Sequence, residues 1–165
     1  MSEQALSAMA DRCREIAGDE YRRRLVKARQ LVASGELPAA RADAEMRAWA
    51  AIALLAGAPI MEAEVAEYRS VIVHYAGDGT PARYDHKLPE DEARCDLARD
   101  LCGPNIWRPI LSRARDAAIA KAIARKGDAE ANHRAANLNL LARALDVPLT
   151  LASCGMAPVS ERKAA

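Results

Sequence analysis

Histidine and cysteine most often build metal or nucleophilic sites, and four of them fall close together in the middle of the chain. They are His74, His86, Cys95 and Cys102. Their spacing contains no C-x-x-C or H-x-x-x-H pair, which would place two metal ligands on one knuckle or on adjacent helical turns. Cys95 and Cys102 lie two helical turns apart, too far to hold one ion together. We therefore predict reduced, structural thiols and no metal.

Other catalytic signatures are also missing from the sequence. No G-x-S-x-G elbow is present, and no cysteine stands in a recognisable catalytic context with a histidine. The AGDG stretch at 76–79 has neither the P-loop spacing nor the dinucleotide-binding spacing. Carboxylates cluster at 62–67 and 90–92, but such groups on amphipathic helices are usually solvated or stabilise helix N-termini. These patterns predict no catalytic residues, no cofactor and a protein that is not an enzyme.

Rings beside predicted loops offer a different chemistry, the anchoring of a protein partner. Aromatic side chains make efficient anchors because they bury a large area when they fill a pocket. The candidate partner-binding residues are Tyr68, Tyr75, Tyr84, His86 and Trp107. The alternative for each of these rings is a place in the core or at its rim.

The stretch LLARALDVPLTLAS, Leu140 to Ser153, has the outline of a helix-turn-helix, the motif that reads DNA with its second helix. A recognition helix would lie in Leu149–Gly155, after a turn that places Asp146 where such motifs favour glycine. The segment LTLASCGMA contains no Arg, Lys, Gln or Asn to reach bases or phosphates, which disfavours this interpretation. The favoured interpretation is the end of a helix followed by an apolar strap that seals the bundle. The strap residues are Leu149, Leu151 and Met156.

The composition sets wider limits on fold and partner. The chain has 165 residues, 51% of them apolar, with no phenylalanine and much alanine and leucine, which is typical of closely packed helices. Its 24 lysines and arginines balance 23 aspartates and glutamates, so a net charge of +1 does not favour binding to nucleic acid. A local basic patch stays open as an alternative. Two cation-rich segments, each spread around its helix, are Arg22, Arg23, Arg24, Lys27 and Arg29, and Arg113, Arg115, Lys121, Arg125 and Lys126.

Hydrophobic periodicity and turn residues predict how the N-terminal third is arranged. Apolar residues at steps of three and four over residues 3–33 indicate one long helix, or two helices divided near Gly18. The SGELP stretch then ends the helix, because Gly35 suits the left-handed conformation and Pro38 suits the first turn of a second helix. This second helix is expected over Ala39–Leu55. The sequence therefore predicts an N-terminal helical hairpin.

The middle of the chain is ambiguous. Residues 58–79 indicate a helix followed by an irregular loop to Pro89. A short β-hairpin near 70–86 is the alternative, because a run of β-branched residues favours strands and Asp78–Gly79 favours a tight turn. Residues 89–103 then indicate another helix, with three acids at its N-terminus and a glycine at its end.

Two further helices are predicted in the C-terminal third. The first has Asn105 as its cap, Pro109 as its real start and Gly127 as its end. The second has Asp128 as its cap and stops before Pro148, because a residue preceding proline disfavours the helical conformation.

Together these segments predict an all-α fold, a single-domain bundle of five to seven helices over residues 1–156 with a flexible tail at 157–165. No apolar run is long enough to span a bilayer. The N-terminus carries acids before any apolar block, which is unlike a secretory signal. We therefore expect a cytoplasmic protein.

The stretch from Tyr21 to Leu55 resembles small, mostly uncharacterised helical proteins of tailed phages and prophages. These combine an arginine-rich helix, a G-x-L or G-x-M turn, and an A-x-x-E motif leading into an M-x-A-I-type helix. The matching residues here are Gly35, Leu37, Ala42, Glu45, Met46 and Ile52. The pattern's usual tyrosine-proline pair is replaced by Leu25-Val26. The resemblance implies a phage origin and carries over no functional residue.

These observations predict a non-enzymatic helical protein that acts by binding another macromolecule. With the origin that the resemblance implies, the hypothesis is that it binds and inhibits a host or anti-phage defence macromolecule by steric occlusion. The alternatives are a helix-turn-helix nucleic-acid binder or transcription regulator, and a homo-oligomeric structural component of a phage.

Overall fold

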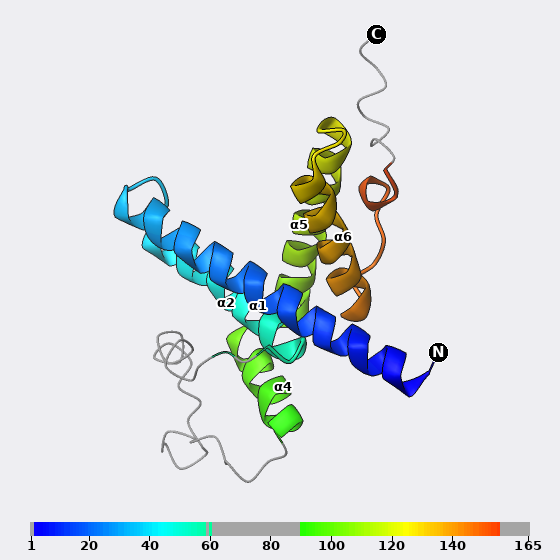
Figure 1. The fold of residues 1–165 in the computed structure, drawn as a ribbon. Helices are drawn as coiled ribbons and strands as arrows, with labels where there is room; N and C mark the ends of the chain where they lie inside the picture. The colour runs from blue at the N-terminus through cyan, green and yellow to red at the C-terminus, as the bar shows by residue number, and fades with distance from the viewer. Residues whose placement is uncertain (1, 59, 61–89, 156–165) are drawn as a thin grey trace. The chain divides into compact units, whose positions relative to one another are not determined.

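The computed structural model describes residues 2–58, 60 and 90–155, and every regular element in these ranges is helical (Figure 1). This confirms the predicted all-α fold class. None of the described helices has the length and apolar content needed to cross a membrane. The alternatives predicted for 58–89, including the β-hairpin near 70–86, lie almost wholly outside the described residues, as does the tail at 157–165.

The contacts divide the chain into two compact units, an N-terminal unit of Met1–Trp107 and a C-terminal unit of Arg108–Ala165. The division falls inside helix α5 (Pro104–Ala124). The single domain over residues 1–156 stays a prediction. Within the N-terminal unit, α1 (Glu3–Ala33) and α2 (Ala39–Leu55) run side by side in opposite directions, as Figure 1 shows, which confirms the helical hairpin.

Local signals explain where this hairpin bends. Gly35 has a φ of 75°, the left-handed conformation that only glycine adopts without a steric penalty. Pro38 directly precedes the first residue of α2. Gly18 does not divide α1; a Cβ built there would lie 3.6 Å from the Cβ of Ala58, an ordinary contact distance. Helix α1 therefore continues through Gly18, and Ala58, which follows α2, lies close to this glycine.

The core of the N-terminal unit is centred on α2. Residues 48–54 of α2 are all buried, and the helix contacts both α1 and α4 (Glu90–Leu101). Because four of these seven positions are alanine, neighbouring helices can approach closely. The largest side chain among them is Trp49, which is 0% exposed. Helix α4 lies within residues 89–103 and confirms the helix that the sequence predicted there.

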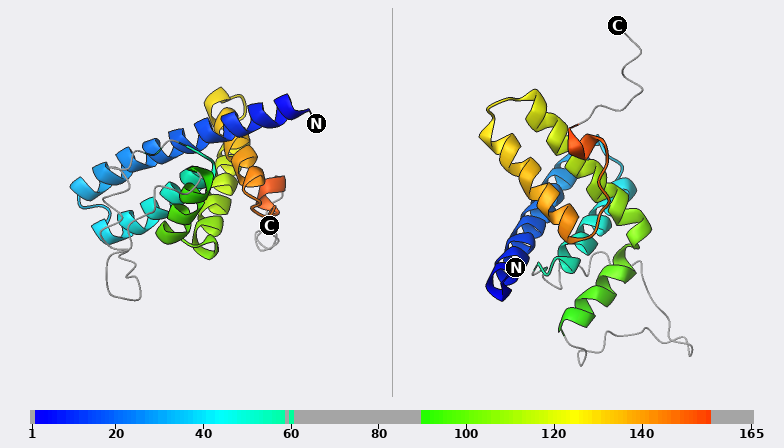
Figure 2. Two further views of the ribbon diagram at one scale, coloured as in Figure 1. Left: turned by 90° about the horizontal axis from the view of Figure 1, so that it is seen from below. Right: turned by 90° about the vertical axis from the view of Figure 1, so that its right-hand side faces the viewer.

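In the C-terminal unit, α5 and α6 (Ala129–Ala144) lie side by side as a second hairpin (Figure 2). Gly127 in the connecting turn has a φ of 88°. Asp128 caps α6 as predicted, its carboxylate accepting a hydrogen bond of 3.0 Å from the Ala131 N–H. The turn residues and the cap therefore fix this hairpin locally, in the same way as Gly35 fixes the first one.

The predicted start of α5 is wrong. The helix begins at Pro104, and Pro109 lies inside it. Pro104 suits the first helical position because its missing N–H has no intrahelical partner there. The Gly103 carbonyl accepts a hydrogen bond of 3.0 Å from the backbone N–H of Ile106. Pro109 cannot donate to the Asn105 carbonyl, but Asn105 is exposed, so water can reach that group.

The segment after α6 differs from both interpretations of it. The recognition helix required over Leu149–Gly155 is absent from this described segment, which forms only a three-residue 3₁₀ turn, η1 (Ala152–Cys154). The apolar strap is also wrong, because Leu149 is 63% and Leu151 is 53% exposed, while Met156 lies outside the described residues. Val147 is the apolar residue of this segment that is buried. We call residues 146–155 the C-terminal strap.

Candidate functional site

Four of the five predicted anchors, Tyr68, Tyr75, Tyr84 and His86, lie outside the described residues. The fifth, Trp107, lies in the first two turns of α5 and is 6% exposed. The backbone N–H of Trp107 donates a hydrogen bond of 3.1 Å to the Gly103 carbonyl. Trp107 therefore occupies a core position, which was the alternative left open for each ring.

Two of the four cysteines lack the exposure that is typical of reactive thiols. Cys13 and Cys102 are buried, and burial raises the pKa of both thiols. For Cys102 the backbone N–H of Trp107 and the charge of Arg47 offset part of the rise in pKa. Both thiols therefore stay protonated near neutral pH, and a thiol is a much weaker nucleophile than a thiolate. Across residues 2–58 and 90–155, no three His, Cys, Asp or Glu side chains gather into a metal-binding group.

Helix α1 extends well beyond the helix that it packs against. With 31 residues against 17 in α2, it is longer by about 20 Å at 1.5 Å per residue. The end of α2 lies beside Arg14, because a Cβ built on Gly57 would be 3.5 Å from the Arg14 Nε. Residues 3–12 therefore continue past α2, and we call them the α1 overhang.

The α1 overhang exposes two large apolar side chains. Leu6 is 49% and Met9 is 36% exposed. At steps of three and four they continue the stripe on which Cys13 and Ile16 are buried. The charged groups beside them are ion-paired within the helix, as in Arg14 with Asp11 at 3.1 Å, an exposed pair that adds only a few tenths of a kcal/mol. The apolar pair is therefore the feature of the overhang with the most to gain from a partner.

A second cluster joins α1 to α2 around Arg24. Its guanidinium lies 3.9 Å from the centroid of the buried Trp49 ring, in cation–π geometry. It also pairs with Glu20 at 3.4 Å and with Glu45 at 3.5 Å. Arg24 belongs to one of the two cation-rich segments of the sequence, and these contacts hold it within the hairpin, with its side chain 23% exposed. The Glu20–Arg24 spacing of one helical turn is visible in the sequence, but exposed ion pairs have the same spacing.

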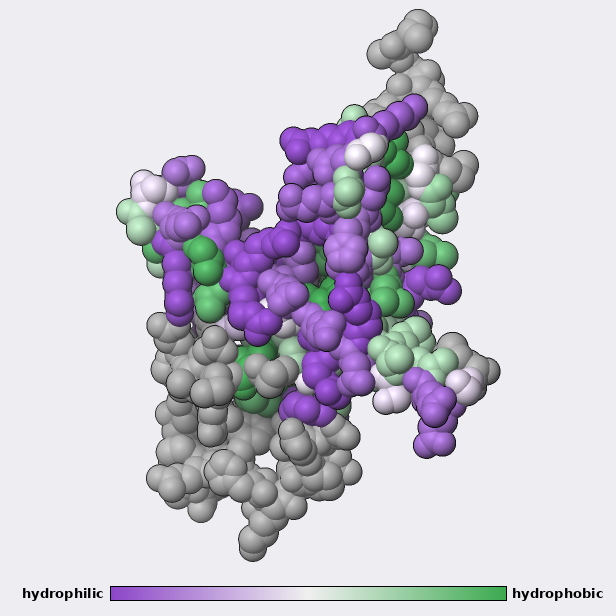
Figure 3. Space-filling model, in the orientation of Figure 1, coloured by the Kyte–Doolittle hydropathy of each residue, from purple (hydrophilic) through white to green (hydrophobic). Residues whose placement is uncertain are grey.

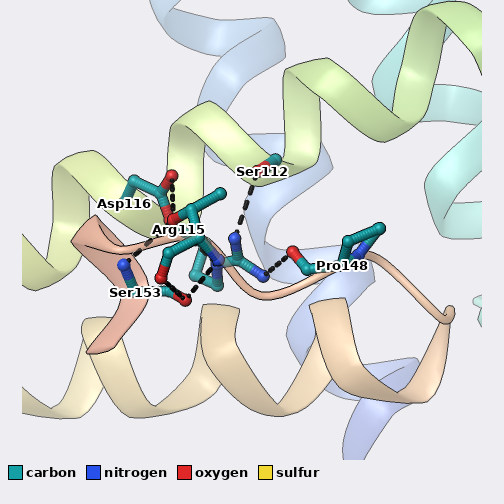
Figure 4. A network of polar contacts seen from close by, with 6 residues as sticks. Ser112, Arg115, Asp116, Pro148 and Ser153 are labelled. Carbon is teal, nitrogen blue, oxygen red and sulfur yellow. Dashed lines mark hydrogen bonds and ion pairs between the residues drawn. The ribbon is translucent and has the colours of Figure 1, made fainter.

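Arg115 in α5 has a side chain that is 0% exposed and lies at the centre of a polar network (Figure 4). Its Nε donates to Asp116 at 2.9 Å, and its two terminal nitrogens donate to the Pro148 carbonyl at 3.0 Å and to the Ser112 hydroxyl at 3.1 Å. Asp116 in turn accepts a 2.8 Å hydrogen bond from the Thr150 hydroxyl. Helix α5 therefore holds the C-terminal strap through a polar network, which we call the Arg115 network.

The hydroxyl groups at the end of this network serve structure and not nucleophilic attack. The Ser153 hydroxyl donates to the Thr150 carbonyl at 2.8 Å, and the Thr150 N–H donates to the Ser153 oxygen at 2.9 Å. A nucleophilic serine needs its proton directed to a base, and here a backbone carbonyl takes that place. Arg115 belongs to one of the two cation-rich segments of the sequence, and one of its partners, the Pro148 carbonyl, is 33 residues away along the chain.

Comparison with protein-family models, curated proteins and solved structures finds no match to the chain. The α1 overhang, the Arg24 cluster and the Arg115 network therefore have to be interpreted from their own geometry. Two of the three are internal, and the α1 overhang exposes apolar side chains on a stripe that is buried further along the same helix.

Proposed function

We propose that this chain is a non-catalytic helical protein that acts by binding another protein through the α1 overhang. The observation that carries the proposal is the exposure of Leu6 and Met9 on a stripe that is buried from Cys13 onward. Large apolar side chains at i and i+3 on an exposed helical stripe form a paired anchor for a hydrophobic groove. Their removal from water on binding supplies the main driving force.

The target class that we propose is a host or anti-phage defence complex, inhibited by steric occlusion. Its support is the resemblance of Tyr21–Leu55 to small helical proteins of phages and prophages. Covering a surface that a complex needs requires contact area and no chemistry, so a projecting helix suits this role.

The test is a quantitative pull-down from a bacterial host lysate with three forms of the full chain. These are the unmodified protein, the double variant Leu6→Glu/Met9→Glu, and the control Val26→Glu. Val26 is 56% exposed on the same helix but outside the overhang, so its variant controls for added charge. We expect a protein that is enriched at least tenfold by the unmodified chain and the control over the double variant. Recovery of no protein that depends on positions 6 and 9 would contradict the proposal.

Light scattering on the same three proteins separates this role from self-assembly. All three side chains are exposed, so the variants should keep the helical circular dichroism of the unmodified chain. If the unmodified protein has a multiple of the chain mass and the double variant has a single mass, the overhang binds a second copy. That result would overturn binding to a foreign partner and favour the homo-oligomeric alternative.

A further inference from the structure

The boundary between the two units divides the charge of the chain unequally. The C-terminal unit of Arg108–Ala165 has 10 lysines and arginines against 5 aspartates and glutamates, a net charge of +5. The N-terminal unit of Met1–Trp107 has 14 against 18, a net charge of −4. The near-neutral total of the chain therefore conceals a basic unit and an acidic one. A basic unit of this size is an electrostatic feature typical of proteins that bind polyanions.

Three of the ten cations of the basic unit lie at the end of the α5–α6 hairpin. Lys121, Arg125 and Lys126 are all exposed there, within the last turn of α5 and the connecting turn. We call these three residues the basic tip. Hydrophilic side chains cover the face of α5 and α6 turned to the viewer in Figure 3.

Asp128 is an acid that partly neutralises the basic tip, and the pKa of its carboxyl is lowered, first by the Ala131 N–H and also by the charges of Arg125 and Lys121. Arg125 pairs with Asp128 only loosely, at 3.7 Å. No salt bridge to Lys121 or Lys126 occurs within residues 2–58 and 90–155. The tip therefore keeps most of its charge available for an anionic partner.

The neighbouring side chains favour a phosphate backbone as that partner. Asn132 and His133 are exposed on the first turns of α6, and both side chain types donate hydrogen bonds to phosphate and sugar oxygens. Ala129 and Ala136 are exposed on the same helix and are small enough to let a polymer approach the backbone. A short row of cations with polar donors and small residues suits contact with phosphates without base recognition.

We propose that the basic tip binds the phosphodiester backbone of nucleic acid, independently of base sequence. This goes beyond the protein-binding role of the α1 overhang and rests on a different unit. It also differs from the helix-turn-helix interpretation, because no recognition helix is involved. Together the two surfaces would make the chain an adaptor between a protein and a nucleic acid.

The test measures binding of the full chain to a fluorescently labelled 20-base-pair duplex by anisotropy, over a series of salt concentrations. Three phosphate contacts predict that log K falls with log salt with a slope of about −3. The variant Lys121→Glu/Arg125→Glu/Lys126→Glu should weaken binding more than tenfold at the lowest salt. The matched control Arg22→Glu/Arg23→Glu/Lys27→Glu changes the net charge equally on exposed cations of the N-terminal unit, and should bind within threefold of the unmodified chain.

Three results would overturn the proposal. One is the absence of binding even at the lowest salt, and another is an equal loss in both triple variants, which would mean that total charge alone matters. The third is binding of the unmodified chain to polyglutamate with no binding to the duplex, which would assign the basic tip to an acidic protein surface. Circular dichroism of each variant establishes that any loss of binding is not a loss of fold.

Discussion

Replacing Arg115 with methionine removes a buried guanidinium that three groups of the C-terminal unit use at once. Methionine retains most of the aliphatic stem, so the main loss is the hydrogen bonds to Asp116, Pro148 and Ser112. A hydrogen bond to a charged group contributes about 1.5–3 kcal/mol, and water can compensate part of the loss because the Asp116 side chain is 21% exposed. We expect the free energy of unfolding to fall by about 3–5 kcal/mol, the usual cost of breaking a buried charged pair.

Urea denaturation followed by far-UV circular dichroism measures this loss. Both tryptophans, Trp49 and Trp107, lie in the N-terminal unit, so tryptophan fluorescence in the same titration follows that unit while circular dichroism follows both. The control is Arg113→Met, two positions away, which makes the same chemical change at an exposed side chain. It should change the free energy of unfolding by less than about 0.5 kcal/mol.

A variant with a smaller expected loss of stability tests the other end of the Arg115 network. Thr150→Val removes the hydroxyl that donates to Asp116 and accepts from the Ser153 N–H, and should cost about 1–2 kcal/mol. The reasoning is refuted if Arg115→Met costs less than about 1 kcal/mol, because a buried charged pair is expected to be worth several times that amount. An equal effect of the Arg113 and Arg115 variants would show that the strap is held by something else.

Two glycines and one helix cap give further predictions. Gly18→Ala should raise the free energy of unfolding by about 0.5–1 kcal/mol, because the new methyl group meets Ala58 at an ordinary contact distance and alanine is the better helix former. Gly35→Ala should lower it by about 1–2 kcal/mol, because the φ of 75° is strained for alanine; the same urea titration measures both opposite signs. The pKa of Asp128 is lowered in the folded state, so its stabilising effect is present at neutral pH and is lost as the pH falls from the ordinary aspartate pKa through the lower folded one. Asp128→Asn keeps a capping oxygen without titrating, so denaturation between pH 6 and pH 2 should show a shallower decline for this variant.

The parts of the fold that the sequence predicted are those decided by nearby residues. The first hairpin followed from Gly35 and Pro38, and the second from Gly127 and the cap Asp128, because each turn needs a particular backbone conformation or hydrogen bond within four residues. The start of α5 was predicted wrongly because two prolines, Pro104 and Pro109, each suit the first turn of a helix. The helix begins at Pro104, where the Gly103 carbonyl accepts the first hydrogen bonds of α5.

The polar contacts could not be predicted from local pattern. Arg24 and Arg115 each stood in a cation-rich segment, where the usual interpretation is a solvated face. Their partners come from another helix or from a distant segment, as with Glu45 for Arg24 and Pro148 for Arg115. An arginine beside an acid on its own helix carries little information about burial, because exposed pairs have the same spacing. The overhang follows from the predicted lengths of the two helices, but the exposure of its apolar residues depends on what packs beside α1.

The unequal charge of the two units shows why a whole-chain count is a poor guide to polyanion binding. Salt screens exposed charges beyond about 10 Å at 0.1 M, so a bound phosphate responds to the charges within that distance. At the basic tip those charges are Lys121, Arg125 and Lys126, opposed mainly by Asp128 and Glu130. Asp128 caps α6 and stays ionised, so these two acids offset part of the charge of the three cations. A total of +1 therefore argues against concentrating the whole chain on nucleic acid, but it places no limit on a local contact made by this hairpin.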